Sequence, residues 1–321
     1  LTLLLLIVHS LRPAIITQLG DLIFDDYQRA HPRTYQDVPV RVVDIDDETL
    51  ARLGQWPWPR TDMARLIRSL AKAGAASIAM DIVFSEPDRT SPARAAAILR
   101  QNPKAKGDYA DIAALEDHDV ILGQAMAETP SVTGYFLQHE PNNVRPPQKA
   151  GFAISGDSPL SAIPGFQGAI IPLAVIDKGA AGTGFVSLVG NADSDGIVRT
   201  APLLAHIGNE MLPSLAVEAL RVAQGAGAII VKSTTGSGEI GGNDPGVVAI
   251  KVGNFEIPTS PRGEMWMYYT APQPQRTVPA WKILTGALSD AQMKQLFGGR
   301  IVFIGTGAAG LRDIVSTPVS P

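Results

Sequence analysis

The sequence contains no cysteine, and this absence excludes disulfide bonds, thiolate catalysis and cysteine-ligated zinc. It does not locate the chain, because the lack of cysteine fits both oxidising and reducing compartments. Basic clusters are lacking too, since no run of lysine and arginine occurs and the formal net charge is -4. Nucleic-acid binding needs a basic surface, so we expect no nucleic acid among the partners.

Catalytic signatures are equally scarce. The sequence has no G-x-S-x-G elbow and no H-E-x-x-H helix, and its five histidines are scattered. It has neither the glycine-rich loop with its lysine nor the HRD-type loop of protein kinases, and we find no cyclase catalytic core. We therefore expect no catalytic residue, no metal site and no cofactor in this chain.

The chain opens on an apolar run, LTLLLLIV (Leu1–Val8). This run is too short to span a bilayer, which takes about 20 residues, so it is either a short buried helix or the truncated end of a membrane-spanning segment. Leucine and isoleucine then recur at helical spacing up to Ile23. We predict that residues 1–30 form the end of a transmembrane helix and a juxtamembrane helix, and that residues 31–321 form a single domain. We expect Leu1–Val8 to be exposed or to pack against the helix of another copy.

Apolar runs alternate with helical patterns over the first part of the chain. Strands are predicted at 38–46, 75–84 and 131–137, and helices from an N-cap at Thr61 to Gly74 and at 119–128. With right-handed crossovers, this β-α-β-α-β order makes a parallel sheet.

The second part of the chain is more irregular. The proline- and glycine-rich stretch 138–170 is predicted to be loop, and the segments 182–190 and 196–208 are predicted to form an antiparallel pair. The closing strand Arg300–Ile304 is expected beside Val40–Asp46. The fold class is α/β: a mostly parallel sheet with flanking helices and an inserted antiparallel section, preceded by an N-terminal membrane-proximal helix.

A glycine pattern ends the closing strand. In GRIVFIGTGAAG, Gly305, Gly307 and Gly310 have the spacing of the dinucleotide-binding fingerprint. That fingerprint also needs a following helix and an acid about 20 residues on, whereas Pro318 follows soon after Gly310. The pattern favours a strand that leaves the sheet through a tight glycine turn. Similarly, NADSDG imitates the start of a calcium loop, but position twelve is Pro202 instead of glutamate, which indicates a turn.

Carboxylates follow several of the predicted strands. Asp44 and Asp46 lie at the end of the first strand, Asp81 in the second, Thr306 after the closing strand and Asp313 just beyond it. The carboxyl ends of parallel strands border the crevice where α/β folds bind ligands. Gathered carboxylates there can bind Mg²⁺ or Ca²⁺ or act as a general acid/base pair.

The segment WPWPR places two indoles and a cation near the same edge. Trp56, Trp58 and Arg60 are either an aromatic ligand wall with a cation for an anion, or a rigid turn whose indoles pack on the sheet. The carboxylates have an alternative as well, because they can cap helices and pair with Arg60 or Arg199. Both alternatives stay open. The candidate ligand-binding residues are Asp44, Asp46, Trp56, Trp58, Arg60, Asp81, Arg199, Thr306 and Asp313.

Four blocks carry a resemblance to a known family. They are IDDETLARLGQWPWPR, AMDIVFSEPD, GFVSLVGNADSDGIVRTAPL and GRIVFIGTGAAGLRDIVSTP. In order and spacing they resemble the CHASE type-two family, the cyclase/histidine-kinase-associated sensory extracellular domains, over roughly Asp21 to Pro321. The W-P-W-x-R and G-x-x-D-x-x-x-T-P blocks are the distinctive ones.

The resemblance implies an extracytoplasmic sensor, periplasmic or extracellular, that one membrane helix precedes. It also implies a parent protein with further membrane helices and a cytoplasmic adenylate/guanylate cyclase or kinase. The expected partners are therefore the membrane, a second copy in a homodimer, and an unknown small-molecule or protein stimulus. An alternative is an enzyme that uses the aspartate-rich crevice on a small phosphorylated substrate. A third hypothesis is a structural spacer that holds two subunits together.

Overall fold

A seven-stranded sheet forms the centre of the computed structural model, which describes residues 14–102, 104–105, 107–187, 195–236, 246–310 and 316–320. Its strand order is β15-β1-β16-β2-β3-β6, and β7 also pairs with β3. All pairings are parallel except that of β6. The strands are β1 (Val40–Asp44), β2 (Ser77–Met80), β3 (Ser131–Gln138), β6 (Gly168–Ile170), β7 (Gly182–Phe185), β15 (Thr277–Pro279) and β16 (Ile301–Gly305). The mostly parallel α/β fold is thus confirmed.

The closing strand β16 lies between β1 and β2. Val42 is in register with Phe303, and Ile304 with Met80. The expected neighbourhood of the closing strand and the first strand is therefore correct. Because these strands are parallel and adjacent, the residues that follow them emerge at one edge of the sheet.

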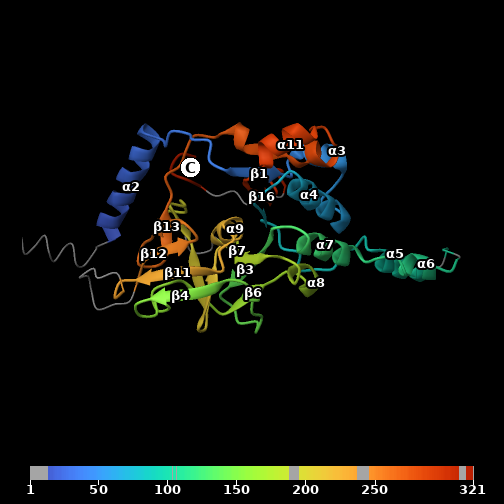
Figure 1. The fold of residues 1–321 in the computed structure, drawn as a ribbon, viewed down its shortest axis with the longest axis horizontal. Coiled ribbons are helices and arrows are strands. Elements are labelled where there is room, and N and C mark those ends of the chain that lie inside the picture. Colours follow the sequence, from blue (N-terminus) through green and yellow to red (C-terminus); the bar gives the residue numbers. More distant parts are fainter. Residues whose placement is uncertain are drawn as a thin grey trace, which may run out of the picture.

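Helices cover both faces of this sheet (Figure 1). One face carries the largest apolar cluster, to which α4, α7, α10 and α11 contribute, while α9 packs on the other face against Ala79 and Val132. The helices that cover the sheet are α3 (Asp47–Leu53), α4 (Arg60–Lys72), α7 (His118–Ala127), α8 (Ala174–Asp177), α9 (Leu215–Ala223), α10 (Ala280–Leu284) and α11 (Asp290–Phe297).

In helix α4 the apolar pattern predicted the buried face correctly, but the predicted N-cap residue is wrong. The predicted stripe Met63, Leu66, Ile67 and Leu70 is fully buried. The predicted N-cap at Thr61 is wrong, because the helix already begins at Arg60, whose backbone N–H donates to the Asp88 carboxylate at 2.8 Å. A residue distant in sequence thus satisfies the first turn.

Smaller sheets form the inserted section. A four-stranded sheet has the order β13-β12-β11-β4, a three-stranded sheet the order β10-β9-β5, and β14 pairs with β8. Their bounds are β4 (Gly151–Ser155), β5 (Gly165–Phe166), β8 (Thr200–Pro202), β9 (Leu204–Ile207), β10 (Glu210–Pro213), β11 (Ala228–Ser233), β12 (Val247–Val252), β13 (Phe255–Pro258) and β14 (Glu264–Trp266).

Two expectations for this section are wrong. The stretch 138–170 contains β4, β5 and β6 besides loops. The segments 182–190 and 196–208 do not pair with each other in their described parts: β7 joins β3 in parallel, β8 joins β14, and β9 joins β10. All four residues of β7 are buried, and a Cβ at Gly184 would lie 2.6 Å from the Leu215 nitrogen. The glycines therefore let β7 sit inside the main sheet beneath α9.

Two peripheral parts extend from the body (Figure 1). One is the arm formed by α5 (Pro92–Gln101) and α6 (Ala110–Ala113). The other is the stem helix α2 (Ala14–Ala30), which lies inside the range predicted to be membrane-proximal. Leu1–Val8 lies outside the described residues, so its exposure stays a prediction. Within the described part of the chain, no helix has both the length and the hydropathy needed to cross a bilayer.

Candidate functional site

The glycine turn after β16 packs against the junction of β1 and α3. The N–H groups of Gly307 and Ala308 donate to the Ile45 carbonyl oxygen at 3.2 and 3.1 Å. The Ala309 N–H donates to an Asp47 carboxylate oxygen at 3.0 Å. These N–H groups, which a dinucleotide fingerprint would turn toward a pyrophosphate, are therefore used within the protein. The glycine pattern serves the close approach of two loops.

The carboxyl edge of the sheet gathers some of the predicted site residues. Asp44 ends β1, and Asp81 and Thr306 directly follow β2 and β16. A Cβ added at Gly307 would overlap the Asp44 carboxylate, and one at Gly305 would lie 3.8 Å from Asp81 Oδ2. The turn after β16 therefore runs between the two carboxylates.

Other members of the predicted set do not join this edge as ligands. Asp46 is the N-cap of α3, where its Oδ1 accepts the Thr49 N–H at 2.8 Å. Asp313 lies outside the described residues. Among the residues that the structure describes, no group of three or more His, Asp or Glu side chains is placed to hold a metal ion. The capping alternative is thus correct for Asp46.

A crevice of about 360 Å³ opens beside Asp81. We call it the edge crevice. Asp81 and Phe303 line it from the sheet, Phe185 from β7, and Met265 and Met267 from β14 and the residue after it. It lies where an open α/β sheet is expected to bind a ligand. Its walls are mostly apolar.

The WPWPR segment packs away from this crevice. Trp58 is buried, its indole N–H donates to the Gly54 carbonyl oxygen at 2.9 Å, and the ring of Trp56 meets it edge-on at 5.5 Å. The guanidinium of Arg60 lies over the Phe84 ring at 4.3 Å, and its Nε is 3.4 Å from Asp119 Oδ1. These contacts match a rigid packed turn rather than an open ligand wall.

The pKa values of Arg60 and the two carboxylates near it are shifted by burial and by hydrogen bonds. Burial raises the pKa of Asp119 above its usual value. Burial also opposes ionisation of Asp88, but the N–H groups of Arg60 and Thr90 outweigh it and lower the pKa of Asp88. Burial lowers the pKa of Arg60. This network fastens α4 to the loop that follows β2.

Arg199 binds the stem helix rather than lining the edge crevice. Its side chain is only 1% exposed. Its Nε and one terminal nitrogen (Nη2) donate to the two carboxylate oxygens of Asp25 at 2.9 and 2.6 Å. Its two terminal nitrogens donate to Asp195 at 3.1 and 2.7 Å. Asp25 belongs to α2 and is fully buried, so this pair joins the stem to the body.

Further hydrogen bonds continue this contact, which we call the stem joint (Asp25, Gln28, Asp195, Arg199 and residues 266–269). The Gln28 amide donates to the Met267 carbonyl oxygen at 3.1 Å and accepts the Tyr269 N–H at 2.9 Å. The rings of Phe24 and Trp266 meet edge-on at 5.1 Å. The stem thus forms hydrogen bonds with the backbone of the same segment whose methionines line the edge crevice.

The stem also meets the far end of the chain. Arg29 Nε donates to the Pro318 carbonyl oxygen at 2.9 Å, and the Val198 N–H donates to the Ser316 carbonyl oxygen at 2.9 Å. Residues 316–320 and the end of α2 therefore lie side by side.

Sequence reasoning missed Asp25 and Gln28. Both are buried, whereas Leu19, Leu22 and Ile23 on the same helix are 53%, 55% and 69% exposed. The available signal was the i, i+3 spacing of two polar residues among apolar ones, which places them on one helix face.

Asp195 has a markedly shifted pKa. Hydrogen bonds from Arg199 lower it from 3.8 to about 2, against the opposing effect of burial, and the Ile197 N–H contributes in the same direction. The side chain of Asp195 is 44% exposed, unlike that of Asp25. Asp195 is therefore the solvent-facing side of the stem joint.

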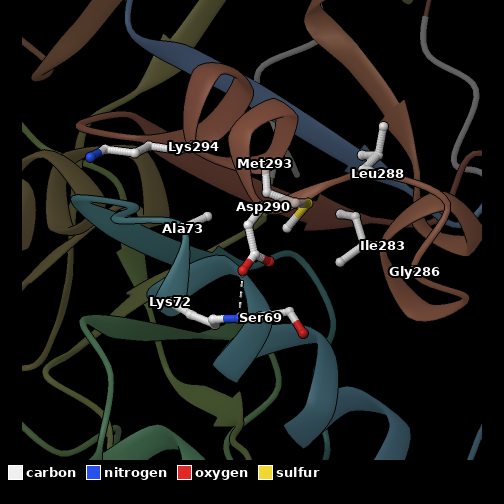
Figure 2. A pocket seen from close by; sticks show the side chains of 9 residues that line it. All are labelled: Ser69, Lys72, Ala73, Ile283, Gly286, Leu288, Asp290, Met293 and Lys294. Atoms are coloured by element: carbon white, nitrogen blue, oxygen red, sulfur yellow. Dashed lines mark hydrogen bonds and ion pairs between the residues drawn. The ribbon is translucent and has the colours of Figure 1, made fainter.

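A separate hollow of about 320 Å³ lies among α4, α10 and α11 (Figure 2). Lys72 and Asp290 span it with an ion pair of 3.0 Å, and both side chains are largely exposed. Exposed ion pairs of this kind contribute little to the stability of the fold. None of the predicted site residues lines this hollow.

Comparisons with known proteins agree with the blocks recognised in the sequence. Searches among curated proteins and among solved structures gave no match. A family model for the CHASE2 domain matches residues 1–321, the whole chain. CHASE2 domains are sensory, non-catalytic extracellular domains of membrane receptors. The chain therefore belongs to the CHASE2 family of sensory domains.

Proposed function

We propose that this CHASE2 domain relays an extracytoplasmic stimulus by changing how its stem helix α2 is docked on the body. The parent receptor carries a cytoplasmic adenylate/guanylate cyclase or kinase, and the domain occupies residues 31–321 behind a membrane-proximal segment, 1–30. The observation that carries the proposal is the buried Asp25–Arg199 pair, which joins residues 174 positions apart.

A buried ion pair suits a joint that has two arrangements. Removing one partner from such a pair costs about 3–5 kcal/mol, because the other charge is left buried without compensation. That cost applies while the stem stays docked. When the stem leaves, water hydrates both charges again and offsets the loss of the pair, so the pair alone does not hold the stem in one arrangement. A stimulus can shift this balance only by its differential affinity for the two arrangements.

The strand segment after β14 links the joint to the interior. Met267 lines the edge crevice, and its carbonyl oxygen accepts a hydrogen bond from the Gln28 amide. A stimulus that displaces this segment also displaces a hydrogen-bond partner of α2. The enzyme alternative receives no comparable support, because Asp46 is engaged as a helix cap.

The relay is tested in the complete receptor. Membranes that carry the parent protein are assayed for cyclic AMP, cyclic GMP and phosphorylation, with Arg199→Gln in the stem joint and Arg221→Gln as the matched control. Arg221 is also a buried arginine, but its carboxylate partner, Glu218, lies in its own helix. We expect Arg199→Gln to change basal output several-fold, and Arg221→Gln to change only the amount of folded protein.

Stem movement is measured separately. Because the chain has no cysteine, Leu22→Cys and Asn254→Cys give two unique labelling positions, both exposed. Spin labels are attached to the two cysteines, and the distance between them is measured by electron–electron double resonance. We expect the distribution of this distance to broaden in Arg199→Gln. An unchanged output in a receptor whose stem has demonstrably left the body would refute the relay.

A further inference from the structure

A third hollow lies where the stem helix leads into the sheet. It measures about 490 Å³ and is lined by Arg33, by residues 265–273 and by Arg276. Arg33 belongs to the connection between α2 and β1, and the other lining residues lie in β14 and the connection from β14 to β15. The Arg33 N–H donates to the Tyr269 carbonyl oxygen at 2.9 Å, so the two connections run side by side. We call this hollow the root pocket.

The charge of the root pocket has one sign. Arg33 and Arg276 line it, and none of the described lining residues is acidic. Neither arginine makes an ion pair with any carboxylate in the described part of the chain. The guanidinium of Arg276 lies over the Tyr35 ring at 4.6 Å, and its Nε is buried without a hydrogen-bond partner. Two cations without a counter-charge and an unused buried donor favour an anion.

The apolar part of the lining is aromatic. Trp266 and Tyr268 are 53% and 47% exposed, although large aromatic side chains are stabilised by burial. Met265 and Met267 also line the pocket. Ligand sites of small molecules combine such apolar and aromatic walls with a few charged groups.

Neighbouring hollows lack this combination. The hollow beside β13 contains Arg262, but its guanidinium is 3.4 Å from Glu264. The edge crevice contains Asp81 and no described arginine or lysine. The root pocket alone among these three joins unpaired arginines to exposed rings in the described residues.

We propose that the root pocket binds a small organic anion, an aromatic ring that carries a carboxylate or a phosphate. The ring lies against Trp266 and Tyr268, and the anionic group meets Arg33 and Arg276. The consequence for signalling rests on the proposed relay: Trp266 contacts Phe24 of the stem, and the Tyr268 hydroxyl donates to the His31 carbonyl oxygen at 2.7 Å. A ligand here therefore touches the groups that hold the stem.

Calorimetric titration of the purified 321-residue chain tests the site, with indole-3-acetate and phenyl phosphate as probes. Indole-3-acetamide is the uncharged counterpart of the first probe, and inorganic phosphate is the ring-free counterpart of the second. We expect saturable binding of at least one probe at one site per chain, and binding about tenfold weaker or worse for its counterpart.

Variants locate the binding. Arg33→Gln and Arg276→Gln are each expected to weaken it about tenfold. Arg94→Gln, an exposed arginine of the distant arm, is expected to leave it unchanged. Arg33 is exposed, so Arg33→Gln does not depend on the folding of a buried group.

Three results would overturn the site: no binding of either probe at about 10 mM, equal binding of the probes and their counterparts, or full affinity in both arginine variants. The titration does not involve signal output. Failure of binding therefore leaves the relay standing, and an unresponsive output with intact binding rejects the relay alone.

Discussion

Two buried arginines of this domain use the same chemistry for different ends. Arg221 and Arg199 each hold a fully buried carboxylate, Glu218 and Asp25, by two hydrogen bonds. Arg221 meets a partner three positions away on α9, whereas Arg199 meets one on a separate helix. The first pair can be lost only by disturbing the core, and the second can be lost when the stem leaves. The same buried ion pair is a local brace in one region and a joint in the other.

The largest effect on stability is expected at the brace. Arg221→Gln leaves Glu218 buried next to the Thr183 N–H, and removes hydrogen bonds to the Ala181 and Ala226 carbonyl oxygens. We expect the free energy of unfolding to fall by about 3–5 kcal/mol. Urea unfolding followed by circular dichroism measures this fall, and the stem–body distance should not change. A shifted distance would show that the two regions are coupled.

At the joint, the loss is expected to be smaller. Arg199→Gln leaves Asp25 uncompensated only while α2 stays docked, and a stem that swings away returns this carboxylate to water. The fall in unfolding free energy is thus limited by the docking free energy, because local opening costs less than global unfolding. We expect less than the loss in Arg221→Gln, together with faster amide hydrogen exchange confined to α2. Exchange that rises evenly over the body contradicts a separable joint.

Acid sharpens the comparison further. The pKa of Asp195 is lowered to about 2, so its contribution is complete above the ordinary value of 3.8 and is lost as the pH falls toward 2. The free energy of unfolding should therefore fall between about pH 4 and pH 2. Urea unfolding is followed over this range in the wild type and in Asp195→Asn, which has no carboxylate to titrate. Parallel curves for the two proteins would show that the pair of Asp195 with Arg199 does not stabilise the fold.

The sheet was predictable from the sequence because its strands are continuous apolar runs between helices with regular apolar spacing. The same reasoning placed Asp44 and Asp81 at one edge, since adjacent parallel strands end together. It failed for β7, whose buried glycines pair with β3 and not with the next strand in sequence. The placement of such a strand depends on partners that are distant in the chain.

The stem joint escaped prediction for a different physical reason. An amphipathic pattern identifies the face that avoids water, and a domain that packs its own helices normally buries that face. On α2 the polar residues Asp25 and Gln28 are buried, and Leu22 and Ile23 are exposed. The sequence pattern of α2 therefore predicted a helix correctly, but it did not indicate which face of that helix packs against the body.

The smallest expected effects separate these two faces of α2. Gln28→Ala removes the hydrogen bonds to Met267 and Tyr269, and leaves their backbone groups to find water, so docking should weaken by about 1–2 kcal/mol.

Ile23→Ser, on the exposed face, should change the stability of an isolated chain by about 0.5 kcal/mol or less. The homodimer expected from the family resemblance adds a second readout, because an exposed apolar stripe on a helix is a surface that a second copy covers well. Ile23→Ser is therefore also examined by sedimentation at several protein concentrations, with Gln28→Ala as the partner variant. A chain that is monomeric before and after the change assigns no role to this stripe in pairing, whereas a loss of dimer in Ile23→Ser alone would divide the stem into one face for the body and one for the second copy.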